Sequence, residues 1–213
     1  ITKPLADFLD KCVLGYERVI SNKQSNVLPD YVICDCFCYE DRRSEVFDIF
    51  VECLKTYKID DIFILAPSFA KKTYPVRRLA NRIKDVHGNG TNIYVPLSDD
   101  ESIDKDVIKG KLVFLTYHQA KGLERKVVIV YNFDASYVKM YNRNDDNTTC
   151  PNPMYVALTR ASEKLILIHH YQMDYLPFIQ IDKLKTYTNF RERPLALYKS
   201  TKNESRLGIT NLI

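Results

Sequence analysis

Short apolar runs alternate with segments of helical period along most of the chain. Such runs are typical of strands buried on both faces, and a helix between them allows successive strands to lie parallel. The alternation therefore predicts an α/β fold, with a parallel sheet and helices on both faces. The expected strands span residues 31–37, 61–67, 91–96, 112–117, 126–134 and 164–170, and the expected helices span residues 4–20, 44–57, 75–83 and 153–162.

The alternation divides the chain into three parts. Residues 31–170 hold the repeated strands and helices and are expected to form one domain. Residues 1–30 hold a single helix and a polar linker, and the chain begins with Ile, so we expect them to lead in from a missing preceding domain. Residues 171–213 show little periodicity and are expected to be a C-terminal extension with at most short elements.

Composition excludes several classes of protein. The chain is 46% hydrophobic and 27% charged, as in soluble globular proteins, and no apolar run approaches the length of a membrane span. The net charge of +4 permits nucleic-acid binding without requiring it. The six cysteines include no CxxC pair, which favours reduced thiols in an intracellular protein over a metal site or disulfides.

Glycine usage excludes a phosphate-binding loop within the chain. Only six glycines occur, and they do not cluster. The pattern GxxxxGK[ST] is absent, because Lys105 stands where the first glycine would precede Gly110 and Lys111. If the chain acts on a nucleoside triphosphate, another domain must supply the P-loop.

One connection between two expected strands is rich in reactive side chains. In parallel sheets, ligands bind outside the carboxyl ends of the strands, so we examined the polar residues that follow each apolar run. The segment LTYHQAKGLERKVVIV carries Thr116, His118, Lys121, Gly122 and Glu124 between two such runs. These side chains could donate to phosphates and accept from a sugar hydroxyl; the alternative is a solvated turn that ends at Gly122.

Two arginine positions are further candidates for binding an anion. Arg160 is expected on the apolar helix 153–162, where an arginine needs a partner, either a structural carboxylate or a phosphate. Arg77 and Arg78 are expected in the first turn of helix 75–83, where a bound anion would offset the unfavourable helix dipole. The alternative is that both are exposed surface arginines.

Together these segments resemble the superfamily 1 helicases of the UvrD/Rep type. LTYHQAKGLERKVVIV is similar to their motif V, T-x-H-x-x-K-G-L-E before an apolar strand, and MYVALTRASEKLIL is similar to their motif VI. DIFILAPSF with PVRRLANRI resembles motif IV more loosely. The resemblance covers residues 31–170 and implies the second RecA-like domain of such a motor, which uses ATP and Mg²⁺ and moves 3′ to 5′ along a single strand, with DNA favoured over RNA.

The resemblance implies a role on the nucleotide for four of the candidates. Arg160 matches the arginine that reaches the γ-phosphate, and Arg77 matches a motif IV arginine with a similar task, with Arg78 as a rival. Glu124 matches the carboxylate that accepts from the ribose. ATP and Mg²⁺ would be held mainly by the missing first RecA-like domain, across a cleft.

The remaining candidates match residues of the motif V turn. Thr116 and His118 match groups near the backbone of the bound single strand. Lys121 and Gly122 shape the turn on the nucleotide side, and Lys121 is a candidate for the interface between the two domains.

The sequence also departs from the family pattern. About thirty residues separate Ile83 from Thr116, so the large domain that UvrD carries there is absent or vestigial, and TTCPNP replaces the charged run ahead of motif VI. We expect the second motor domain of an ATP-dependent helicase that is inactive without the first domain. The alternative is a non-enzymatic module with a helicase-like fold that binds nucleic acid or protein.

Overall fold

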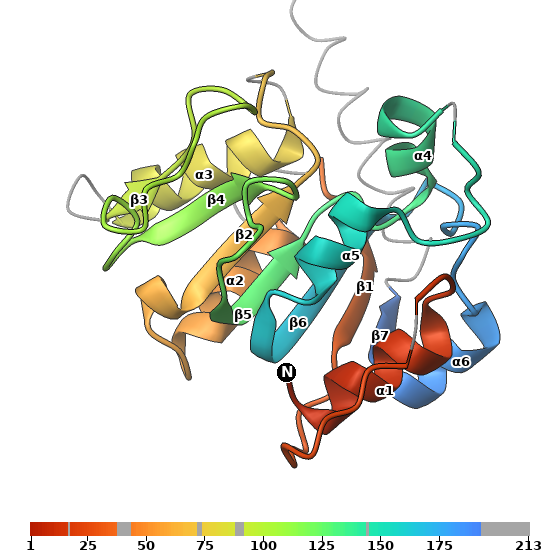
Figure 1. Ribbon diagram of the computed structural model, residues 1–213. Coiled ribbons are helices and arrows are strands. Elements are labelled where there is room, and N and C mark those ends of the chain that lie inside the picture. Colours follow the sequence, from red (N-terminus) through yellow and green to blue (C-terminus); the bar gives the residue numbers. More distant parts are fainter. Residues whose placement is uncertain (17, 38–43, 72–73, 88–91, 144, 193–213) are drawn as a thin grey trace, which may run out of the picture.

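The described strands form one parallel sheet. The structure is a computed structural model, and it describes residues 1–16, 18–37, 44–71, 74–87, 92–143 and 145–192. Seven strands lie in the order β3-β4-β2-β5-β6-β1-β7, and every pairing is parallel (Figure 1). The strands are β1 (Asp30–Cys34), β2 (Ile62–Ala66), β3 (Ile93–Tyr94), β4 (Leu112–Thr116), β5 (Arg125–Val130), β6 (Ala161–His170) and β7 (Asn189–Glu192).

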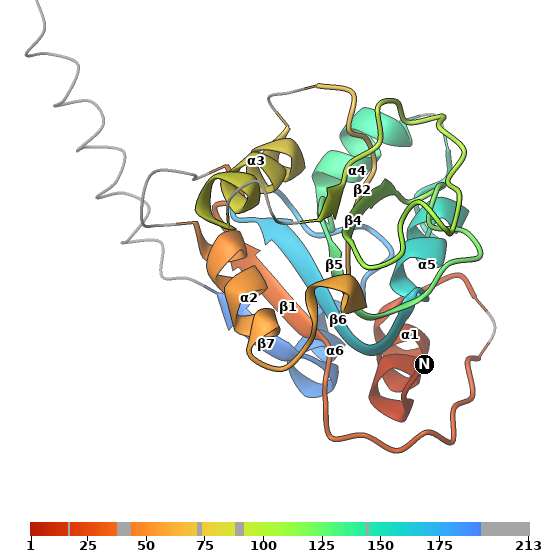
Figure 2. The same cartoon turned by 90° about the vertical axis from the view of Figure 1, so that its left-hand side faces the viewer.

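Helices cover both faces of this sheet, as predicted. One face packs against α2 and α3, and the other packs against α1, α4, α5 and α6 (Figures 1 and 2). The helices are α1 (Lys3–Cys12), α2 (Glu45–Leu54), α3 (Pro75–His87), α4 (Ala135–Tyr141), α5 (Asn152–Leu158) and α6 (Ile181–Tyr187), and a short 3₁₀ turn, η1 (Ile59–Asp61), precedes β2.

Alternating side chains of the central strands supply both hydrophobic layers. In β2, Phe63 and Leu65 belong to the cluster under α1 and α5, whereas Ile62 and Ile64 belong to the cluster under α2 and α3. All five residues of β2 are buried. This two-sided burial explains why the strand is a continuous apolar run in the sequence.

The sheet and core extend beyond residues 31–170. Helix α1 buries Phe8 in the same core as Phe178 and Leu184, and β7 pairs with β1. The segment NFRE has no apolar run, so the pattern could not reveal β7. Residues 1–16 and 171–192 are therefore packed parts of the domain and not a linker and an extension.

The first helix is shorter than its apolar period suggested. It ends at Cys12, because Val13 takes an extended backbone conformation and bridges to Ile179. Gly15 has φ of +113°, and a Cβ there would lie 2.5 Å from Thr149 Cβ. This close approach fixes the chain against the segment that leads into α5.

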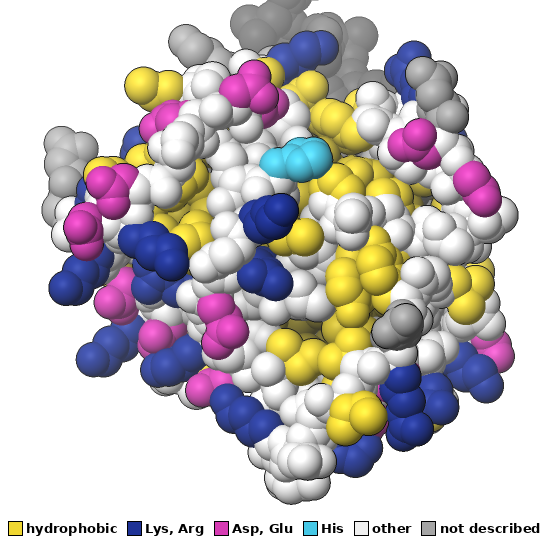
Figure 3. Space-filling view, viewed as in Figure 1, with side chains coloured by type: hydrophobic (Ala, Val, Ile, Leu, Met, Phe, Trp, Pro, Cys, Tyr) yellow, Lys and Arg dark blue, Asp and Glu magenta, His cyan; other side chains and the backbone are white. Residues whose placement is uncertain are grey.

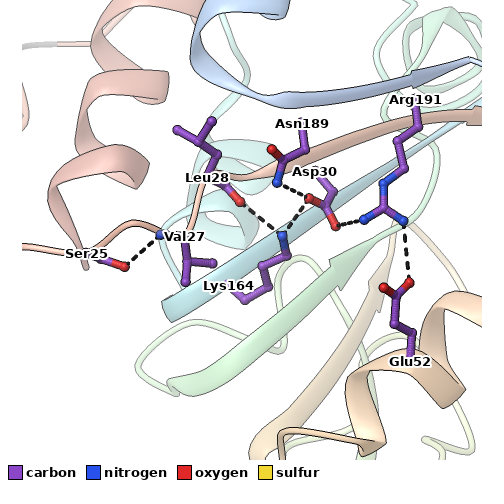
Figure 4. A network of polar contacts seen from close by, with 8 residues as sticks. All are labelled: Ser25, Val27, Leu28, Asp30, Glu52, Lys164, Asn189 and Arg191. Carbon is purple, nitrogen blue, oxygen red and sulfur yellow. Dashed lines mark hydrogen bonds and ion pairs between the residues drawn. The ribbon is translucent and has the colours of Figure 1, made fainter.

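A buried carboxylate anchors the edge strand β7. Asp30 accepts from Lys164 Nζ at 2.5 Å and from Asn189 Nδ2 at 2.8 Å, and it pairs with Arg191 at 3.4 Å (Figure 4). Arg191 also contacts Glu52 of α2 at 3.5 Å. The network joins β1, β6 and β7 near their amino ends and holds these strands together there.

Two further expectations concern membrane helices and cysteines. No helix among the described residues is long and apolar enough to cross a membrane. Cys12, Cys34, Cys36, Cys53 and Cys150 are buried free thiols, and burial raises the pKa of Cys53 to about 11. Cys38 lies outside the described residues.

Candidate nucleotide and nucleic-acid sites

The loop from β4 to β5 divides the predicted site residues between the two ends of the parallel strands. We call the side where the strands begin the amino edge and the side where they end the carboxyl edge. The two strands are parallel with β2 between them, so residues 117–124 must return from the carboxyl end of β4 to the amino end of β5. Tyr117 and Ala120 are buried in the core on the way. Five residues of strand separate the two edges by about 16 Å.

Glu124, Gly122 and Lys121 lie toward the amino edge. Gly122 has φ of +79°, a left-handed conformation that favours glycine, and it turns the chain just ahead of β5. Lys121 and Glu124 are exposed. The expectation that all polar site residues follow a strand is wrong for Glu124, which precedes one.

Arg160 lies beside this turn and not on a helix as expected. Helix α5 ends at Leu158, and Arg160 occupies the turn that leads into β6. Its Nη1 donates to Leu123 O at 3.2 Å, and its carbonyl accepts from the Arg125 N–H at 3.1 Å. These bonds join the segment LTYHQAKGLERKVVIV, near Leu123 and Arg125, to the segment MYVALTRASEKLIL, at Arg160, on the amino edge.

The guanidinium of Arg160 is held mainly by carbonyl groups. Nε donates to Val156 O at 3.0 Å, and Nη2 donates to the Thr159 hydroxyl at 3.0 Å. Three of its five N–H groups are thus used within the described part of the chain, which leaves two for a planar, bidentate contact. The residues present therefore fit a phosphate oxygen pair, and Glu124, which forms no ion pair with Arg160 in the described structure, keeps its acceptor oxygens for hydroxyl donors.

A cavity of about 290 Å³ adjoins Glu124 at the amino edge. Arg125 lines it, donates to the carbonyls of Asp60 and Ile108, and lies over the Phe63 ring; burial lowers its pKa. Sequence reasoning missed Arg125. The signal was present, since a cation at the start of a buried strand needs acceptors.

The other end of the loop lies at the carboxyl edge. Thr116 is buried; its N–H donates to Gln119 Oε1 at 2.9 Å, and its hydroxyl accepts from the Gln119 N–H at 3.2 Å. Gln119 also donates to the carbonyls of Ser98 and Glu101. These bonds fix the turn that presents the exposed His118, so Thr116 supports this turn from within.

Arg77 does not join Arg160. Its Nε donates to Phe69 O and its Nη2 donates to Pro96 O, both at 2.9 Å, and its guanidinium lies over the Phe69 ring. Phe69 and Pro96 follow the carboxyl ends of β2 and β3, at the edge opposite Arg160. In the described structure Arg77 and Arg160 therefore lie at opposite ends of the strands, and the expectation that both reach one γ-phosphate stays a prediction.

A parallel sheet of this topology, with charged turns at its amino edge, defines a RecA-like α/β domain of the helicase type. A family model described as the UvrD-like helicase C-terminal domain matches residues 40–172, more than half of the chain, so the chain belongs to this family. A search of curated proteins finds no match.

Among solved structures, the chain is similar to the C-terminal domain of a possible DNA helicase from Lactobacillus plantarum WCFS1. The identity is 16% and the TM-score 0.52, and the match covers 90% of this chain and 96% of that one. At this identity, the similarity shows the fold alone.

Proposed function

We propose that this chain is the C-terminal motor domain of an ATP-dependent helicase that moves 3′ to 5′ on DNA. One observation supports this above others: Arg160 and the turn before Glu124, far apart in sequence, are bonded to each other through Leu123 O. A guanidinium with two remaining N–H groups and a nearby carboxylate suit the two ends of a nucleotide, its phosphates and its ribose.

In this proposal the chain supplies one side of the nucleotide site. Arg160 stabilises charge on the γ-phosphate, and Glu124 accepts from the ribose. Gly122 sets the direction of the turn, and the exposed Lys121 faces the first RecA-like domain. That domain supplies the P-loop, the Mg²⁺ ligand and the group that orients water, and Mg²⁺ neutralises phosphate charge when bound.

The carboxyl edge serves the single strand in the same proposal. His118 is exposed at the end of β4 and can contact a phosphate, and Thr116 acts by fixing its turn. Arg77 is assigned to the support of this edge, through Phe69 O and Pro96 O. Nucleotide and nucleic acid thus occupy opposite edges, linked by one loop.

The test is a titration of the ¹⁵N-labelled chain with ATP, followed by its amide spectrum, beside a phosphate-release assay. We expect weak binding, changes confined to Gly122, Leu123, Glu124, Arg125 and Arg160, and no turnover, because the chain has no P-loop. Changes at Thr116 and His118 instead would contradict the assignment. A longer protein that contains this chain and a P-loop domain, yet hydrolyses no ATP, would favour the non-enzymatic binding module.

A further inference from the structure

The cavity at the amino edge has an excess of positive charge. Three of the described residues that line it are cations and one is a carboxylate: Lys105, Lys109, Arg125 and Glu124. Asp104 and Asp106, in the same turn as the two lysines, are not among the described residues that line it. Over the face seen in Figure 3, by contrast, Lys and Arg are interspersed with Asp and Glu on the side of β4 and β5. The excess at the cavity is local, and such an excess favours a bound anion.

The two lysines come from a turn that is fixed against the start of β5. Ile108, which lies between them in the sequence, is buried in the core. Its carbonyl accepts from Arg125 Nη2 at 3.1 Å, so the turn is tied to the residue that follows Glu124. Lys105 and Lys109 themselves are exposed, and neither forms an ion pair within the described part of the chain. A fixed backbone therefore presents two ammonium groups that are available to a ligand.

A nucleotide bound as proposed above would pass this cavity. Leu123 also lines the cavity, its carbonyl accepts from Arg160 Nη1 at 3.2 Å, and Glu124 is the next residue of the chain. In the function proposed above, Arg160 contacts the γ-phosphate and Glu124 contacts the ribose. The α- and β-phosphates join these two parts of the nucleotide, just as Leu123 lies between the two side chains. The cations of the cavity are therefore next to the expected path of these two phosphates.

We propose that Lys105 and Lys109 bind the α- and β-phosphates of the nucleotide. The inference rests on the function proposed above and adds to it two phosphate-binding residues. Both lysines lie between Ile83 and Thr116, where the sequence departs from the family pattern, so the family resemblance assigns them no role. A lysine ammonium binds phosphate as a compact point charge with rotatable donors, which suits two adjacent phosphates. The chain should then distinguish a nucleotide from a nucleoside without a P-loop.

The experiment titrates the ¹⁵N-labelled chain with ATP, adenosine and inorganic tripolyphosphate, and the amide shifts give the three dissociation constants. Lys105→Ala combined with Lys109→Ala should weaken ATP and tripolyphosphate binding about fivefold, as for the loss of two exposed ion pairs. Adenosine binding should not change, since adenosine has no phosphate. Glu124→Gln should weaken adenosine binding and should not weaken tripolyphosphate binding. Lys105→Arg combined with Lys109→Arg should bind all three ligands like the parent chain, because both charges remain.

Lys139→Ala combined with Lys183→Ala is the matched control. These exposed lysines lie in α4 and α6, outside the described lining of the cavity, and the double variant loses the same charge. It should bind all three ligands like the parent, and equal weakening by the control pair would overturn the proposal. If Glu124→Gln weakens adenosine binding but loss of the two cavity lysines leaves ATP and tripolyphosphate binding unchanged, the phosphate role is wrong and the proposed nucleotide site stands. If the parent binds neither ATP nor adenosine, both are wrong.

Discussion

The two edges of the sheet are held together in different ways. At the amino edge, charged side chains bind backbone carbonyls or each other: Arg160 on Leu123 O, Arg125 on Ile108 O, and Lys164 on Asp30. At the carboxyl edge, loops are tied to loops both by neutral bonds, such as those of Gln119 with Ser98 O and Glu101 O, and by the bonds of Arg77 to Phe69 O and Pro96 O. The guanidinium groups of Arg160 and Arg125 lie where we place the nucleotide, and a turn fixed by Gln119 is found where we place the strand.

In the proposed arrangement, the short loop from β4 to β5 contacts both ligands, the nucleotide and the single strand. Residues 117–124 contribute His118 to one edge and Glu124 to the other, with buried Tyr117 and Ala120 between them. A nucleotide that shifts the Leu123 turn would act on the same loop that presents His118. The predictions below test whether the edges are as distinct as this comparison implies.

The largest effect is expected for Arg160 in a longer protein that includes the first motor domain. Arg160→Ala should lower the ATPase rate by roughly 10³–10⁵-fold, as for other arginines on a transferring phosphoryl group. Arg160→Lys should rescue little, because lysine lacks the planar fork. Steady-state phosphate release measures both. In the isolated chain, Arg160→Ala removes three side-chain hydrogen bonds and should lower the free energy of unfolding by about 2–3 kcal/mol. A variant that hydrolyses ATP near the parent rate would reduce Arg160 to a structural residue.

The second prediction concerns the amino edge away from the nucleotide. Asp30→Ala leaves Lys164, whose side chain is 15% exposed, without its carboxylate. Loss of one partner of a buried pair should lower the free energy of unfolding by about 3–5 kcal/mol. Urea denaturation measures this, and Asp182→Ala, at an exposed helix position, is the control with little expected change. Equal effects of the two variants would mean that β7 is held by other contacts.

The third prediction is for Arg77 at the carboxyl edge. Arg77→Ala removes two charge-assisted hydrogen bonds and should lower the free energy of unfolding by about 2–3 kcal/mol. Arg18→Ala is the control, since Arg18 is 83% exposed and its pair with Asp10 is 3.8 Å long. We expect strand binding to weaken with Arg77→Ala, because Pro96 precedes the loop that holds Gln119. Unchanged stability with a loss of ATP binding would restore Arg77 to the nucleotide site.

The sequence predicted the layers of the fold better than its edges. Apolar runs such as residues 61–67 correspond to buried strands because burial on both faces leaves a continuous pattern. Strand β7 left no such pattern, because it is an edge strand in which only Phe190 is partly buried, and helix α4 was not predicted. For the proposed site, the motifs singled out Glu124, Arg160 and His118 as candidates, but they did not indicate at which end of the strands each lies.

The sequence alone could not indicate at which edge Arg77 and Arg160 lie, because this depends on the order of the strands in the sheet. Both arginines are near an apolar strand in the sequence, and periodicity does not say whether a loop stays at one edge or crosses the sheet. The crossing depends on strand order, with β2 inserted between β4 and β5. Because strand order arises from contacts between distant segments, local sequence pattern could not separate the two arginines.

The smallest effect is a pH dependence expected only at the carboxyl edge. His170 is buried at the end of β6, and burial lowers its pKa from the ordinary 6.5, an effect that Asp35 and Asp134 only partly oppose. Its Nδ1 has no hydrogen-bond partner in the described structure, and Asp35 Oδ1 is 3.8 Å away. The folded state therefore favours the neutral imidazole.

The sign of the effect follows from proton binding. Below pH 6.5 the unfolded chain takes up a proton on His170 more readily than the folded chain does, so stability falls as the solution is acidified. The slope from one group is at most about 1.4 kcal/mol per pH unit. His170→Gln should flatten the loss of stability between pH 6.5 and the lower pKa of the folded state, whereas His118→Gln, at an exposed position, should not. Urea denaturation at a series of pH values measures both variants. If His170→Gln loses stability at low pH as steeply as the parent, carboxylates such as those of the Asp30 network at the amino edge control the loss. The two edges would then not differ in their sensitivity to pH.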